Sequence, residues 1–121
     1  MGTRDRFEAA FAGQTVAWAE EELSLSTREI AGAMGGVDRK TVQRWKKGQA
    51  APRPEHRRYL EYLNQLRYLL DGAFRTDDGK LRWIHTPSPA LGGRTPFFAL
   101  TSGEIETVLE VLAGVAHGSH R

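Results

Sequence analysis

The segment from residue 54 to about residue 72 constrains the fold most. It begins with Pro54, which suits the first turn of a helix because proline lacks a backbone N–H and fixes φ near the helical value. Leucines then recur at helical spacing and form one apolar stripe, at Leu60, Leu63, Leu66 and Leu70. The spacing predicts a long central helix, and the rest of the chain is expected to cover its apolar face.

Two shorter helices are expected before this one. The stretch "STRE" at 26–29 has the capping-box pattern, so a helix should begin at residue 27 and end at the glycine pair 35–36. Asp38 is suited to cap a following helix over 39–47, which Gly48 closes.

The remaining segments also read as helices, at 14–23, 81–85 and 97–100. "TSGE" at 101–104 has a second capping-box pattern and predicts a final helix with one apolar stripe, at Ile105, Val108, Leu109, Leu112 and Val115. No segment alternates apolar and polar residues as a strand would. The expected fold class is all-α.

Composition excludes several classes of function. With 121 residues, 40% of them hydrophobic and none of them cysteine, the chain suits one or two small globular modules without disulfides or thiolate chemistry. It has no nucleophile and base at a spacing typical of a catalytic pair, and no zinc-binding signature. We therefore expect no enzyme activity, cofactor or metal. His117 and His120 could chelate a metal in principle, but a solvated tail is the favoured interpretation. No apolar run approaches the ~20 residues that cross a bilayer, which predicts no membrane partner and a cytoplasmic location.

Positive charge is concentrated in the middle of the chain. On a helical wheel, one face of 39–47 gathers Lys40, Gln43, Arg44 and Lys47, while Thr41, Val42 and Trp45 lie opposite. Ile30 and Met34 of the preceding helix can meet Val42 and Trp45 in a small shared core. These side chains can donate to base edges and to phosphates. The alternative is a basic amphipathic helix with no nucleic-acid partner.

The stretch "TREIAGAMGGVDRKTVQRWKKG" resembles a helix-turn-helix of the Xre or phage-repressor type. The resemblance implies operator DNA as a partner, bound as a homodimer on paired half-sites. The candidate DNA-binding residues are Arg39, Lys40, Thr41, Gln43, Arg44, Lys46 and Lys47, with Arg39 and Lys46 flanking the reading face. Arg53, Arg57 and Arg58 are interpreted either as phosphate clamps or as solubilising groups.

A proline-rich stretch, "WIHTPSPALGGRTP" at 83–96, is stiff because its prolines fix backbone angles. Followed by "GEIETVLEVL", it resembles the toxin-binding domain of the MbcA/ParS/Xre antitoxins over residues 75–118. The candidate toxin-binding residues are Trp83, Thr86, Pro87, Pro89, Leu91, Gly92, Gly93, Arg94, Thr95 and Pro96, with His117 and Arg121 in a tail that could reach the partner. Phe97 and Phe98 are expected in the core, with the alternative that one reaches the interface.

This resemblance implies an antitoxin that covers the active cleft of a RES-domain toxin, an enzyme that consumes NAD or transfers ADP-ribose from it, and that represses their shared operon. The expected domains are a helix-turn-helix bundle at 1–74 and a small helical toxin-binding domain at 75–121, with a higher hetero-oligomer formed with the toxin. The alternative is a stand-alone transcription regulator whose C-terminal half only dimerises.

Overall fold

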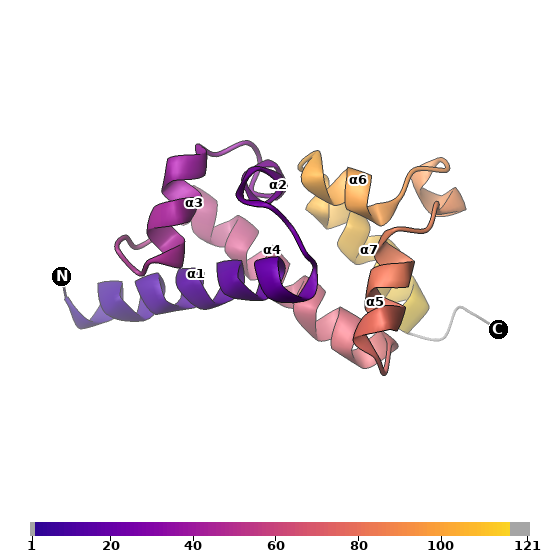
Figure 1. Cartoon of the computed structure of the whole chain (residues 1–121), viewed down its shortest axis with the longest axis horizontal. Coiled ribbons are helices and arrows are strands. Elements are labelled where there is room, and N and C mark those ends of the chain that lie inside the picture. Colours follow the sequence, from indigo (N-terminus) through magenta and orange to yellow (C-terminus); the bar gives the residue numbers. More distant parts are fainter. Residues whose placement is uncertain (1, 117–121) are drawn as a thin grey trace.

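Helices joined by loops make up the computed structural model, which describes residues 2–116 (Figure 1). In chain order they are α1 (Thr3–Glu22), α2 (Thr27–Ala33), α3 (Arg39–Lys46), α4 (Pro54–Ala73), α5 (Asp77–Ile84), the 3-10 helix η1 (Pro89–Leu91), α6 (Pro96–Thr101) and α7 (Ile105–Ala116). The predicted all-α class is confirmed, since the described range contains no strand. Within the same range, no helix combines the length and the apolar character needed to cross a bilayer.

Local signals set the ends of α2 and α3 as the sequence predicts. The Ser26 hydroxyl accepts from the Glu29 amide at 3.1 Å, and the Ser26 amide donates to the Glu29 carboxylate at 2.8 Å, which completes the capping box. The Asp38 carboxylate accepts from the Lys40 amide at 3.0 Å and caps α3. Gly35 has φ of 87°, in the left-handed region that glycine tolerates best, so the chain can leave α2 there.

The second predicted capping box is wrong. Thr101 is the last residue of α6, and its hydroxyl donates back to the Phe97 carbonyl at 3.0 Å. The Glu104 carboxylate does not reach back to a helix start, because Arg94 holds it. The predicted stripe of α7 is nevertheless confirmed, since Ile105, Val108, Leu109 and Leu112 are buried and Val115 packs beside them.

Two helices begin earlier than the sequence patterns indicate. α1 starts at Thr3 instead of residue 14, since its first turns have no apolar stripe that a wheel would detect. α5 starts at Asp77 instead of residue 81, because the Thr76 hydroxyl accepts from the Gly79 amide at 3.0 Å and caps it.

α4 is the centre of the molecule, as its leucine spacing predicts. Its stripe is fully buried, at Leu60, Leu63, Leu66 and Leu70. α7 packs along α4, α1 also contacts α4, and α3 packs on α1. One cluster of buried side chains includes residues from both halves of the chain. The predicted division into domains at 1–74 and 75–121 stays a prediction, and the two parts share one core.

The two halves also meet where α2 crosses α6. Gly32 in α2 lies so close to the end of α6 that a Cβ at this position would overlap the carbonyl oxygen of Thr101. The backbone of Gly32 is not in the left-handed region, so its conformation does not require glycine. The close approach of the two backbones does, because it leaves no room for a Cβ. The helix-turn-helix segment and the C-terminal helices are thus in direct contact.

Candidate functional site

The exposed face of α3 gathers the side chains that the wheel predicts. Lys40, Gln43, Arg44 and Lys47 are exposed and line an open hollow of about 450 Å³, together with Asp38, Thr41 and Gln49. The opposite face packs into the core through Val42 and Trp45, each only 1% exposed. α3 is therefore fixed by one side and presents donors on the other.

The cations around α3 differ in whether their own chain already binds them. Within residues 2–116, no acidic side chain forms an ion pair with Arg39, Lys40, Arg44 or Lys47. Lys46 is different, because its ammonium group lies 3.0 Å from the Glu20 carboxylate of α1. Four of the predicted DNA-binding cations are thus available to an external anion, while Lys46 also ties α3 to α1.

Arg57 does not lie free on the surface. Its Nε donates to the Glu8 carboxylate at 2.8 Å, its Nη1 lies 3.0 Å from the Glu61 carboxylate, and its guanidinium stacks 4.7 Å from the centre of the Phe11 ring. The hydrogen bond that Arg57 donates to Glu8 is the main reason that the pKa of Arg57 is raised. These contacts join α1 to α4. Arg57 therefore has a structural role that differs from both sequence interpretations, a phosphate clamp and a solubilising group. Arg53 and Arg58 are exposed.

The loop between α5 and α6 is closed by its own backbone hydrogen bonds. The Ser88 amide donates to the Arg94 carbonyl at 2.9 Å, and the Ser88 carbonyl accepts from the amides of Leu91 and Gly93 at 3.0 and 2.9 Å. Gly92 and Gly93 have φ of 68° and 87°, which lets the chain turn tightly after η1. The loop has a defined shape before any partner binds.

Arg94 ties this loop to the start of α7. Its Nε donates to the Leu91 carbonyl at 3.0 Å, and its two terminal nitrogens donate to the two oxygens of Glu104 at 2.6 and 3.0 Å. Such a bidentate pair fixes both side chains. The hydrogen bond from Arg94 is the main reason that the pKa of Glu104 is lowered. The guanidinium of Arg94 therefore already has its partners within the chain.

The structure sorts the predicted toxin-binding residues by exposure. Leu91 and Pro96 are buried, and Trp83, Arg94 and Thr95 are half-buried. Trp83 lies 6.2 Å from Phe74, ring centre to ring centre, and Thr95 caps α6 by accepting from the Phe98 amide at 3.0 Å. The exposed members are Thr86, Pro87, Pro89, Gly92 and Gly93. His117 and Arg121 lie outside the described residues.

Phe98 is the residue that the sequence interpretation misplaced. It is 54% exposed instead of buried in the core, and the Arg94 guanidinium lies 6.0 Å from its ring centre. Phe97 is half-buried against the core and stacks with His85 at 4.7 Å between ring centres. An aromatic ring therefore stands in solvent beside the proline loop. The adjacent pair "FF" gives no signal for which ring faces outward.

No metal site accompanies these surfaces within residues 2–116, where no group of three histidine, cysteine, aspartate or glutamate side chains lies close enough to hold an ion. Every buried side-chain nitrogen and oxygen in this range has a hydrogen-bond partner.

The C-terminal part of the chain is similar to known toxin-binding domains. Residues 69–118 match the family described as "Antitoxin Xre/MbcA/ParS C-terminal toxin-binding domain". The fold is similar to that of a chain in the crystal structure of the M. tuberculosis MbcT-MbcA toxin-antitoxin complex, with a TM-score of 0.57 and 27% sequence identity over 88% of this chain and 94% of that chain. No curated protein matches the sequence. The resemblance to the Xre/MbcA/ParS antitoxins, stated from the loop residues, is confirmed.

Proposed function

We propose that this chain, an antitoxin of the Xre/MbcA/ParS type, binds a RES-domain toxin through the surface between α5 and α6, covers the toxin's active site, and represses its own operon through α3. Neutralisation by covering an active site requires binding alone and no catalytic group in the antitoxin. The proposal places the complex in the cytoplasm, where operator DNA and NAD are both present.

The observation that carries the toxin-binding part is the exposed Phe98 ring beside a loop that is already closed. Aromatic rings beside a rigid backbone are typical anchors of protein interfaces, because they bury a large area and lose little conformational entropy. Thr86, Pro87 and Pro89 are exposed in the same loop. We propose that they and Phe98 contact the toxin.

Other residues of the loop motif are proposed to act indirectly. Leu91 and Pro96 are buried under the loop, and Arg94 is bound to Leu91 and Glu104. Their side chains hold the loop in the shape that the toxin recognises. This division separates residues whose loss changes contacts from residues whose loss changes loop geometry.

The DNA-binding part rests on the free cations of α3. Arg39, Lys40, Arg44 and Lys47 have no ion pair within residues 2–116, and Gln43 is exposed among them. Arginine and lysine can bind guanine or phosphate, and glutamine can pair with adenine. A single short recognition helix binds DNA weakly, so we propose a homodimer on paired half-sites.

Co-expression tests the function as a whole. A RES-domain enzyme encoded beside this chain is expected to arrest growth when expressed alone and to be harmless with the wild-type chain. Phe98→Asp is expected to restore toxicity while the variant keeps its helical circular dichroism, because the ring is already exposed. Tyr68→Asp is the matched control, since Tyr68 is 71% exposed on α4. Equal protection by all variants would remove Phe98 from the interface. Failure of the wild-type chain to protect, with operator binding retained, would favour a stand-alone regulator.

A further inference from the structure

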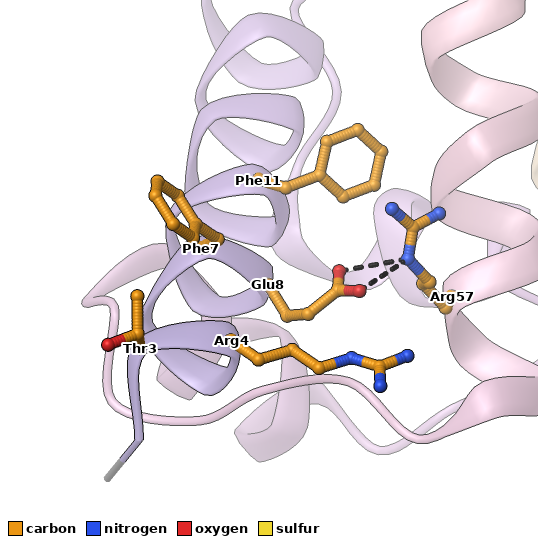
Figure 2. Close-up of a pocket in the computed structure, with 6 residues that line it drawn as sticks. All are labelled: Thr3, Arg4, Phe7, Glu8, Phe11 and Arg57. Atoms are coloured by element: carbon orange, nitrogen blue, oxygen red, sulfur yellow. Dashed lines mark hydrogen bonds and ion pairs between the residues drawn. The ribbon is translucent and has the colours of Figure 1, made fainter.

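Three arginines at the start of α4 have three different surroundings. Arg57 points toward α1, where it binds the Glu8 carboxylate and stacks on the Phe11 ring (Figure 2). Arg53 and Arg58 are exposed and form no ion pair within residues 2–116. Arg53 also lines a hollow of about 250 Å³ between α3 and α4, and Arg58 does not. Arg53 is thus both unpaired and set in a hollow.

The side chains that line this hollow are cationic or neutral, with no acidic group among them. Arg44 contributes from α3, and Arg53 and His56 contribute from the start of α4. Neither arginine has an ion pair within residues 2–116. The imidazole of His56 has no hydrogen bond in that range. Two free guanidinium groups therefore border one small volume, where an anion would relieve their mutual repulsion.

Trp45 adds a donor that its own chain leaves unused. It lines the hollow, is only 1% exposed, and packs edge-to-face against His56 with 5.5 Å between ring centres. Its indole N–H forms no hydrogen bond within residues 2–116, whereas every side-chain nitrogen and oxygen sealed from solvent in this range has a partner. The N–H is therefore reachable from solvent, and the hollow is the surface that Trp45 lines. A bound anion would give this donor a partner.

The hollow lies beside the exposed face of α3. The larger hollow along that face shares Thr41 and Arg44 with it, so the two are adjacent. A third hollow borders the opposite flank of α3 and is lined by Thr27, Gln43, Lys46 and Lys47. A recognition helix in the major groove has one phosphodiester strand along each flank. The hollow that Arg53 lines is therefore placed where one of these strands would run.

We propose that this hollow binds one backbone phosphate of operator DNA through Arg53 and Arg44, with His56 and the Trp45 N–H as further donors. Charge-assisted hydrogen bonds from arginine suit a phosphate, whose oxygens accept several donors at once. The inference rests on the proposed operator binding and extends it from α3 to the start of α4. A phosphate contact carries no base information, but it fixes where α3 lies in the groove.

Binding of the full chain to two duplexes of equal length, one from directly upstream of its own gene and one of random sequence, tests the inference at several salt concentrations. Arg53→Ala is expected to weaken binding to both duplexes and to lower the slope of log affinity against log salt by about 0.9 for each bound subunit, as for one phosphate contact fewer. Arg58→Ala is the matched control, because it removes the same charge from an exposed position outside the hollow, and its slope should stay as in the wild type. The Arg53 side chain caps no amide of α4, and circular dichroism checks that both variants are folded.

A scan of the DNA backbone locates the contact. Duplexes carry a neutral methylphosphonate in place of one phosphate at a time, which removes the charge that Arg53 would bind. The wild type is expected to lose affinity at one position in each half-site where Arg53→Ala loses much less, since that variant has no contact there to lose. Arg58→Ala should follow the wild type at that position.

The remaining outcomes separate the phosphate contact from operator binding as a whole. A wild type that binds neither duplex would overturn operator binding itself, and with it the phosphate contact. Equal slopes for Arg53→Ala and the wild type, or slopes lowered equally by Arg53→Ala and Arg58→Ala, would overturn the phosphate contact and leave operator binding intact. A wild type and an Arg53→Ala variant that respond alike at every methylphosphonate position would do the same.

Discussion

The face of α3 and the loop between α5 and α6 are both proposed as binding surfaces, but they are built in opposite ways. α3 is a regular helix whose exposed side chains are cationic and free of partners. The loop is irregular, its backbone is closed by its own hydrogen bonds, and its one arginine is bound internally. The first construction suits a partner recognised through charge and hydrogen bonding, and the second suits a partner recognised through shape. This difference yields predictions that separate the two surfaces.

The largest effect is expected from removing the apolar support under the loop. Leu91 is 3% exposed, and Leu91→Ala is expected to destabilise the fold by roughly 2–4 kcal/mol, the usual cost of such a cavity. Urea denaturation followed by circular dichroism measures this change. Pro89→Ala is the control, because Pro89 is the exposed first residue of η1, and this variant should change stability far less. Comparable losses in both variants would mean that the buried contact is not what supports the loop.

The next effect concerns α3 alone. Arg44→Ala together with Lys47→Ala is expected to weaken operator binding by about 1–3 kcal/mol in total and to reduce the dependence of affinity on salt. Stability and toxin neutralisation should stay as in the wild type, because neither side chain has an ion pair within residues 2–116. Gel-shift titrations at several salt concentrations, beside growth assays with the toxin, check both parts. Lost neutralisation with intact operator binding would reverse the assignment of the two surfaces.

A moderate effect is expected where the two halves touch. A Cβ at Gly32 would overlap the Thr101 carbonyl, so Gly32→Ala forces α2 and α6 apart and should cost about 1–3 kcal/mol as overpacking does. Gly72→Ala is the control, since nothing lies within 4 Å of a Cβ there. Thermal unfolding of the two variants measures the difference. A Gly32→Ala variant as stable as Gly72→Ala would mean that the α2–α6 contact is loose.

The smallest effect is a pH dependence of the loop. Arg94 lowers the pKa of Glu104, so the carboxylate favours the folded state above its unfolded pKa, about 4.3, and this contribution is lost as the pH falls through the lowered folded value. Toxin binding is therefore expected to weaken slightly in this acid range. In Glu104→Gln the same affinity profile should be flatter. Identical profiles for the two proteins would contradict the role of the Arg94–Glu104 pair in shaping the loop.

The sequence predicts the parts of the fold that depend on local chemistry. The leucine spacing of α4, the Ser26 capping box and the Asp38 cap each specify a helix from residues within a few positions, and each is confirmed. The capping pattern at 101–104 fails because Glu104 is bound by Arg94, ten residues away. The early start of α1 is missed because its first turns carry no apolar stripe.

The candidate surfaces show the same division. The face of α3 follows from helical spacing alone, since the buried and exposed residues alternate as the wheel predicts. The loop residues could be named from their resemblance to a family, but their sorting into exposed and buried depends on the tertiary structure. Phe98 and Phe97 are adjacent and identical in type, and only the packing of α6 against its neighbours decides which ring is exposed.

Hydrogen–deuterium exchange of the full chain, free and then bound to either partner, tests the separation of the two surfaces most directly. With the RES-domain toxin, the account predicts added protection in residues 85–98 and none in 39–47. With operator DNA, it predicts protection in 39–47 and none in 85–98. Protection of the same segment by both partners, or the exchange of the two patterns, would contradict the account.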